Sequence, residues 1–143
     1  MSTLKNPPKS FWIVAIIGLL WNLMGVYQFY IGNYDLESLR ASVSPEEYSI
    51  MESLPMWYSA LFAIAVFSGV IGCALLLTKK KIAILFFMVS LLTVLIAELY
   101  WLISTNIMEV SGAIATAMPL TVLAISIFLY FYSKGAAGKK WIK

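Results

Sequence analysis

Residues 79–105 read KKKIAILFFMVSLLTVLIAELYWLIST, three lysines followed by a long run that is apolar or weakly polar except for Glu98. At about 1.5 Å of rise per residue, a helix over residues 82–105 is long enough to cross the roughly 30 Å hydrocarbon core of a bilayer. The lysines at one end, and Tyr100 with Trp101 at the other, are typical of the two membrane interfaces. This stretch is therefore predicted to be a transmembrane helix.

The composition of the whole chain indicates a membrane protein. Of its 143 residues, 62% are hydrophobic and 12% are charged, whereas about a quarter of the residues in a soluble domain are charged. This length leaves room for a single membrane domain, residues 1–143. One cysteine and no histidine argue against zinc, haem or histidine-based catalysis, so we expect no cofactor and no metal. The net charge of +3 reflects lysines at predicted membrane boundaries, and we expect no nucleic-acid partner.

Apolar runs of this kind predict an all-α integral membrane protein with four transmembrane helices in a bundle. We expect the spans at residues 11–31, 56–77, 82–105 and 110–133, an outer loop at 32–55, a cytoplasmic turn at 78–81 and a flexible cytoplasmic tail at 134–143. Pro119 lies inside the fourth predicted span, where its missing backbone N–H should kink the helix.

The basic residues predict the orientation of the chain. Nine of the ten lysine and arginine residues lie in the two terminal segments and the central turn, and only Arg40 lies in the first loop. Because basic residues favour the cytoplasmic side, we expect a multi-pass protein with both termini in the cytoplasm. Six of the seven acidic residues then fall in the two outer loops.

The first outer loop contains a good helix start, Ser44-Pro45-Glu46-Glu47, with Ser44 as the N-cap and Pro45 in the first helical position. Apolar residues at helical spacing on both sides of it predict one or two short helices on the outer membrane surface. We interpret their acidic face as a solvated surface. The alternative is that it attracts a cation or a protein partner.

The first two predicted spans each carry a stripe of small residues around one polar side chain. The members are Gly18, Asn22 and Gly25 in the first span, and Ser68, Gly69 and Gly72 in the second. Small residues let membrane helices approach closely, so these faces are predicted to pack together. Asn22 and Ser68 reach the same depth near the midplane and are predicted to form a hydrogen bond. A solute-binding role for Asn22 is the alternative to a structural one.

Glu98 is the only acidic or basic residue inside any predicted span, which makes it a candidate functional residue. Helical rise places it toward the outer leaflet, at the depth of Gln28, Tyr58 and Ser59. We expect Glu98 to face the bundle and to form a hydrogen bond with one of these, because a carboxylate in contact with lipid is costly. The alternative is that its side chain bends outward to interfacial water.

Five segments of the chain form a recognisable set: Trp21-Asn22-Leu-Met-Gly25, Ser44-Pro45-Glu46, Pro55-Met-Trp57, the block from Ala63 to Leu77 and the closing Lys-Lys-Trp141-Ile. Together they resemble the motifs of a family of small, uncharacterised bacterial four-helix inner-membrane proteins. The resemblance implies an inner-membrane location, and some family members are automatically labelled sugar transporters. It supplies no functional residue. The family is richer in Ala and Arg, whereas this chain uses Ile, Lys and Phe.

Two functions of different classes agree with these features. The first is a transport-related protein that works as a homo-oligomer and binds a small polar solute, such as a sugar, or an ion between its helices. The second is a structural or accessory subunit of a larger membrane complex. A single carboxylate without a second acid, a histidine or a nucleophile is a poor catalytic set, so we expect no enzyme. Apart from the lipid bilayer, the sequence identifies no ligand or partner.

Overall fold

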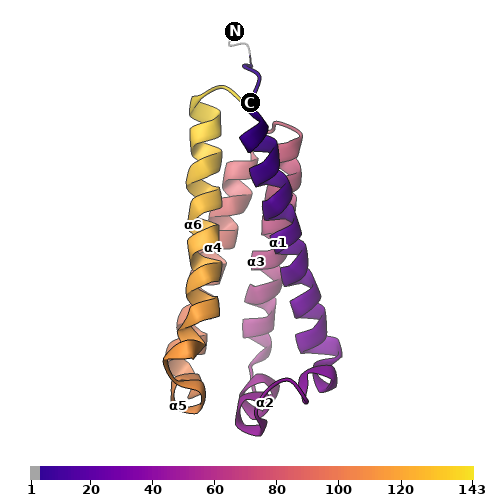
Figure 1. Cartoon of the computed structure of the whole chain (residues 1–143), viewed down its shortest axis with the longest axis vertical. Coiled ribbons are helices and arrows are strands. Elements are labelled where there is room, and N and C mark those ends of the chain that lie inside the picture. The colour runs from indigo at the N-terminus through magenta and orange to yellow at the C-terminus, as the bar shows by residue number, and fades with distance from the viewer. Residues whose placement is uncertain (1–3) are drawn as a thin grey trace.

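The computed structural model describes residues 4–143, which form a bundle of helices (Figure 1). The elements are α1 (Lys9–Tyr34), the 3₁₀-helix η1 (Leu36–Leu39), α2 (Pro45–Glu52), α3 (Met56–Leu77), α4 (Ala83–Leu99), the π-helix η2 (Tyr100–Ser104), α5 (Ile107–Ser111), the 3₁₀-helix η3 (Gly112–Thr116) and α6 (Ala117–Gly138). Among the described residues there is no strand. Within residues 4–143, four helices are long and apolar enough to cross a membrane: α1, α3, α4 together with η2, and α6. The chain is therefore an all-α, multi-pass membrane protein with four transmembrane helices, as predicted.

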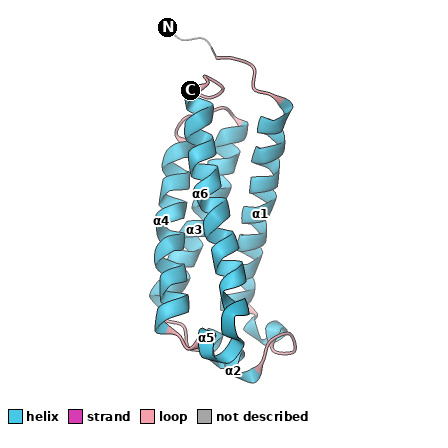
Figure 2. Cartoon of the chain, turned by 60° about the vertical axis from the view of Figure 1, so that its left-hand side comes forward, coloured by secondary structure: helices cyan, strands magenta, loops and turns pink. Residues whose placement is uncertain are grey.

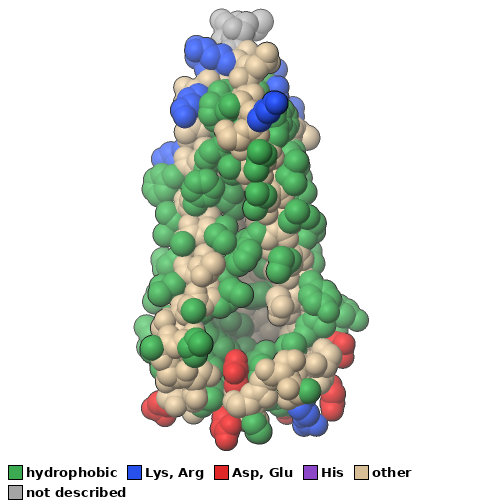
Figure 3. All heavy atoms as spheres, viewed as in Figure 1, with side chains coloured by type: hydrophobic (Ala, Val, Ile, Leu, Met, Phe, Trp, Pro, Cys, Tyr) green, Lys and Arg blue, Asp and Glu red, His purple; other side chains and the backbone are tan. Residues whose placement is uncertain are grey.

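The four long helices form an incomplete ring. α3 packs against α1 on one side and α4 on the other, and α4 packs against α6. α1 and α6, which would close the ring, are scarcely in contact and diverge toward one end (Figure 1). That end contains α2 and α5 and most of the acidic side chains, and we call it the acidic end (Figure 2, Figure 3). The opposite end, where the lysines gather, is the basic end.

α1 and α3 cross closely through small residues, as predicted. A Cβ added to Gly25 would lie 2.7 Å from Cγ1 of Val66, and a Cβ added to Gly69 would overlap Oδ1 of Asn22. A larger side chain at either position would force the two helices apart. Gly72 does not belong to this contact, contrary to the prediction. A Cβ there would meet Phe87 of α4, so Gly72 makes room for the third span instead.

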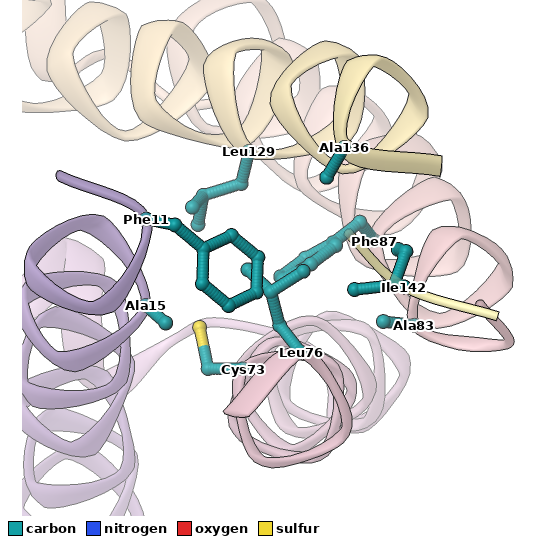
Figure 4. Close-up of a cluster of buried hydrophobic side chains, with 9 residues drawn as sticks. All are labelled: Phe11, Ala15, Cys73, Leu76, Ala83, Phe87, Leu129, Ala136 and Ile142. Carbon is teal, nitrogen blue, oxygen red and sulfur yellow. The ribbon is translucent and has the colours of Figure 1, made fainter. Parts of the chain in front are cut away.

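A cluster of buried side chains closes the basic end (Figure 4). Its members are Phe11, Ala15, Cys73, Leu76, Ala83, Phe87, Leu129, Ala136 and Ile142. They come from all four long helices and from the segment that follows α6. Phe11 and Leu76 are among the largest side chains that solvent cannot reach. The cluster is the main core of the protein, and we call it the basic-end core.

The segment after α6 is built into this core and is not the flexible tail that the sequence predicts. The N–H of Lys143 donates to the carbonyl oxygen of Lys79 at 3.1 Å, and the N–H of Lys81 donates to the carbonyl oxygen of Lys143 at 2.7 Å. These bonds hold Ile142, which is 3% exposed, across the end of the bundle. Flexibility was predicted from the lysines and glycines, but the attachment is made by backbone groups and one apolar side chain.

The fourth span also differs from the prediction. α6 covers Ala117–Gly138 and not residues 110–133. Before it, Gly112 has φ 69° and ψ −157°, a conformation that is open essentially only to glycine. The predicted helix is therefore broken there, and Pro119 lies in the first turn of α6. A missing N–H in the first turn leaves no helical hydrogen bond unmade, so Pro119 does not kink the helix.

The first loop forms the short elements that its sequence predicts, η1 and α2. Oγ of Ser44 accepts a hydrogen bond from the N–H of Glu47 at 3.1 Å, so Ser44 is the N-cap of α2. Arg40 lies 3.2 Å from Oε1 of Glu37 and stacks over the ring of Tyr48. The one basic residue of this loop is thus engaged within the loop itself.

Candidate functional site

A cavity of about 820 Å³ lies between the four long helices, in the half of the molecule nearer the acidic end. Each long helix contributes to its lining, together with residues of η1, α2, η2, α5 and η3. Figure 3 shows the face between the diverging α1 and α6, which is hollowed toward the acidic end. A volume of this size is typical of pockets that hold small molecules. The cavity is therefore the candidate site.

The floor of the cavity is formed by the basic-end core. Phe87 and Leu129 belong both to that core and to the cavity lining. Leu129 also reaches across to α1, where a Cβ added to Gly18 would lie 3.2 Å from its Cδ2. This contact joins α6 to α1 on the side of the cavity that faces the basic end. The cavity is consequently closed toward the basic end and open on the side where the two helices diverge.

Asn22 lies at this floor. Its Nδ2 donates to the carbonyl oxygen of Gly18 at 2.8 Å and lies 3.9 Å from Sγ of Cys73. Its Oδ1 lies against Gly69. Within residues 4–143, the predicted hydrogen bond to Ser68 is not made, and Ser68 does not line the cavity. Equal depth in the membrane did not fix the direction of each side chain around its helix, and Asn22 meets the residue after Ser68.

Glu98 lines the cavity from the last turn of α4. The hydroxyl of Tyr58, on α3, lies within electrostatic reach of the Glu98 carboxylate. Trp101 lines the same region from η2, with its ring centroid 6.4 Å from that of Tyr58. The wide turn of the π-helix η2 changes the direction of the side chains that follow Glu98, and such turns are frequent at functional sites.

The structure brings together four of the five predicted intramembrane polar residues. Asn22, Gln28, Tyr58 and Glu98 line one cavity, and only Ser68 lies outside it. Glu98 faces the bundle, as expected. No hydrogen bond joins Glu98 to Gln28, Tyr58 or Ser59 in the part of the chain that the structure describes, although all three line the cavity. The expected partners thus line the same cavity as the carboxylate without being hydrogen-bonded to it.

Three serines, Ser90, Ser111 and Ser126, and most of the aromatic lining were not predicted as site residues. Oγ of Ser90 donates to the carbonyl oxygen of Ala65 at 2.8 Å and so ties α4 to α3. Oγ of Ser126 donates to the carbonyl oxygen of Val122 within α6. The aromatic lining consists of Trp21, Phe29, Tyr58, Phe62, Phe87 and Trp101. A serine or an aromatic residue in a membrane helix carries no signal of its own, because its role depends on how that helix is rotated.

The charged groups of the lining are acidic. Glu98 lies within the cavity, and Glu47 and Glu52 of α2 lie at its acidic end. No lysine or arginine of the described chain lines it. Nor does the described part of the chain hold three acidic, cysteine or histidine side chains together as a metal site would require. The cavity therefore offers carboxylates, aromatic faces and a few neutral polar groups.

Comparisons with known proteins add no relative to this picture. No protein-family model matches the chain, and no curated protein or solved structure matches it. The fold and the cavity define the class of protein: an all-α, multi-pass membrane protein with four transmembrane helices around a cavity that is open at one side.

Proposed function

We propose that this is a transport-related membrane protein that binds a small solute in the cavity between its four transmembrane helices. The cavity carries this proposal, because it is large enough for a ligand and is lined by all four spans. Polar side chains at membrane depth are costly and usually serve a function. Asn22, Gln28 and Glu98 all face this space. A bound solute would give Gln28 and Glu98 a polar partner and would also contact Asn22.

Transport requires that the same site open in turn to each side of the membrane. In this structure the basic end is closed by side chains that include Phe11, Leu129 and Ile142. The opposite state would need these contacts to part while α1 and α6 come together at the acidic end. Four helices make a narrow bundle, so we include a homo-oligomer in the proposal, as in transporters built from repeated helix sets.

We further propose that the protein lies in a bacterial inner membrane with both termini in the cytoplasm. The support is the gathering of lysines at the basic end and of acids at the acidic end, together with the resemblance of its motifs to small inner-membrane proteins. The cavity then opens toward the outer side. Reporter fusions should place both termini in the cytoplasm, and a terminus found outside would contradict this orientation.

The solute-binding role is tested by purification in mild detergent, followed by thermal unfolding with panels of sugars, ions and organic solutes. A ligand that binds only the folded state raises the unfolding temperature. We expect a lone homo-oligomer that at least one solute class stabilises. Ser126→Phe, which fills the cavity from α6, should abolish that stabilisation. Ile127→Phe is the matched control, because Ile127 is its neighbour but does not line the cavity.

A structural or accessory role is the second candidate, and the gap between α1 and α6 favours it. Met24 and Met118 are 62% and 63% exposed and line the cavity from these two helices, so a helix of a partner protein would find an apolar surface there. A stoichiometric unlike partner after purification, with no solute effect on unfolding, would support this role and contradict solute binding.

A further inference from the structure

The charges around the cavity are of one sign. Glu98 lies within it, Glu47 and Glu52 lie at its acidic end, and no basic residue of the described chain lines it. Arg40, the basic residue in the adjoining loop, does not line the cavity, and its Nη1 lies 3.2 Å from Oε1 of Glu37. A cavity lined by one sign of charge concentrates ions of the opposite sign. A cation is therefore attracted to this space, and an anion is repelled from it.

The surroundings of Glu98 suit an organic cation better than an inorganic one. The rings of Tyr58 and Trp101 line the same cavity as the Glu98 carboxylate, with centroids 6.4 Å apart and planes 34° apart. Aromatic faces attract cations, and several together form the cages that recognise organic ammonium groups. A small metal ion would instead need several oxygen ligands, and the described residues hold no such group of acidic side chains.

The open side of the cavity faces the region that lipid occupies in a membrane. α1 and α6 are scarcely in contact, and the exposed side chains of Met24 and Met118 line the cavity at their edges. A molecule with an apolar body can therefore reach the cavity from within the bilayer. A strongly hydrated solute would have to enter from the acidic end alone.

From these three features we infer that the solute is an amphipathic organic cation, with one positive charge on an aromatic or alkyl body. Its charge lies beside Glu98, and its body contacts the aromatic lining around Tyr58 and Trp101. This inference rests on the proposed function, since it names the chemical class of the solute for the same cavity.

The test compares two probes of similar size and opposite charge, tetraphenylphosphonium and tetraphenylborate, with glucose as a neutral polar solute. Binding to the purified full-length protein is measured by equilibrium dialysis, with protein-free micelles of the same detergent as the blank. We expect tetraphenylphosphonium to bind and both other probes to bind at least about ten-fold more weakly, because only the cation is attracted by the carboxylate of Glu98.

Three variants assign the effect to the carboxylate in the cavity. Glu98→Gln should weaken tetraphenylphosphonium binding by about ten-fold or more, whereas Glu98→Asp, which keeps the charge, should retain most of it. Glu109→Gln removes an exposed acid of α5 that does not line the cavity, and it should leave binding unchanged. Size-exclusion profiles and helical circular dichroism show whether each variant is folded. The Glu98→Asp comparison keeps the inference testable if the amide variant is unstable.

Equal binding of both ions, or an unchanged affinity in folded Glu98→Gln, would overturn the inference and leave solute binding intact. Binding of glucose without tetraphenylphosphonium would do the same. If no probe binds and no solute of the wider panel alters thermal unfolding, both the inference and the proposed function are wrong.

Discussion

Asn22 connects the packing of α1 on α3 with the floor of the cavity. Its Nδ2 is satisfied by the carbonyl oxygen of Gly18 in its own helix, and its Oδ1 lies against the bare backbone of Gly69. The amide thus fits only because residue 69 has no side chain. Asn22 therefore has a structural role at the helix crossing, and its position in the cavity lining adds a second role in the proposed function.

Gly69→Ala should destabilise the protein by about 1–3 kcal/mol, because the new Cβ would overlap Oδ1 of Asn22 in a packed interface. The measurement is the midpoint of thermal unfolding in detergent. Gly135→Ala on α6 is the control, since nothing lies within 4 Å of a Cβ there, and alanine should be neutral or stabilising. Adding Asn22→Ala to Gly69→Ala should recover part of the loss. If Gly69→Ala unfolds at the same temperature as the control, α1 and α3 do not pack closely at residue 69.

Single residues differ in how far the sequence identifies their role. Glu98 could be selected because a carboxylate in an apolar span is rarely without a function. Ser90 could not, although its Oγ makes a hydrogen bond between α4 and α3. The sequence predicted a hydrogen bond between a different pair of helices, from Asn22 on α1 to Ser68 on α3. Depth follows from counting residues, but the side-chain direction depends on the rotation of each helix, which small differences in packing decide.

At the scale of elements, Gly112 decides where the fourth span begins. The hydropathy of residues 110–133 does not reveal this, because glycine is common inside membrane helices. In the structure, its positive φ ends α5 and lets α6 begin at Ala117 with Pro119 in its first turn. The number and type of the long helices were predictable from apolar length, whereas this boundary depended on one backbone conformation.

Gly112→Ala should therefore destabilise the protein by about 1–3 kcal/mol, because alanine is strained at this φ and ψ. A continuous helix through residue 112 would give the opposite sign, since alanine stabilises a helix interior relative to glycine by about 1 kcal/mol. Comparing the thermal unfolding midpoints of Gly112→Ala and Gly135→Ala distinguishes these two structures. An increase in stability for Gly112→Ala would support a continuous helix through residue 112.

The segment after α6 closes the basic end, so a substitution that weakens its packing should expose the buried side chains of the basic-end core. Cys73 is the only cysteine and is fully buried in the same core as Ile142. Ile142→Ser should speed maleimide labelling of Cys73 in detergent by about ten-fold or more, because removing a buried Ile side chain costs a few kcal/mol. Ile103→Ser, at a position 76% exposed and outside the core, should leave the rate unchanged. Equal rates for the two variants would show that Ile142 does not hold the closure.

The whole molecule has two different ends. Lysines and a dense core lie at one end, and acids, short helices and an open cavity lie at the other (Figure 3). The charge difference was predictable from the sequence by counting basic residues. The cavity was not, because it arises where α1 and α6 fail to meet, and no local pattern in either helix records the absence of that contact.

The most direct measurement of the one-sided cavity is the accessibility of single cysteines to a membrane-impermeant thiol reagent in a Cys73→Ala background. Ser126→Cys lies in the cavity, and Ala136→Cys lies in the basic-end core. Both variants are exposed to the reagent in intact cells and in inside-out vesicles. The comparison shows to which side of the membrane the cavity opens. We predict that Ser126→Cys reacts in intact cells and that Ala136→Cys reacts in neither preparation until the protein is denatured. Failure of Ser126→Cys to react from either side, or equal reaction of the two cysteines, would contradict a cavity that is open to water on one side and closed at the basic end.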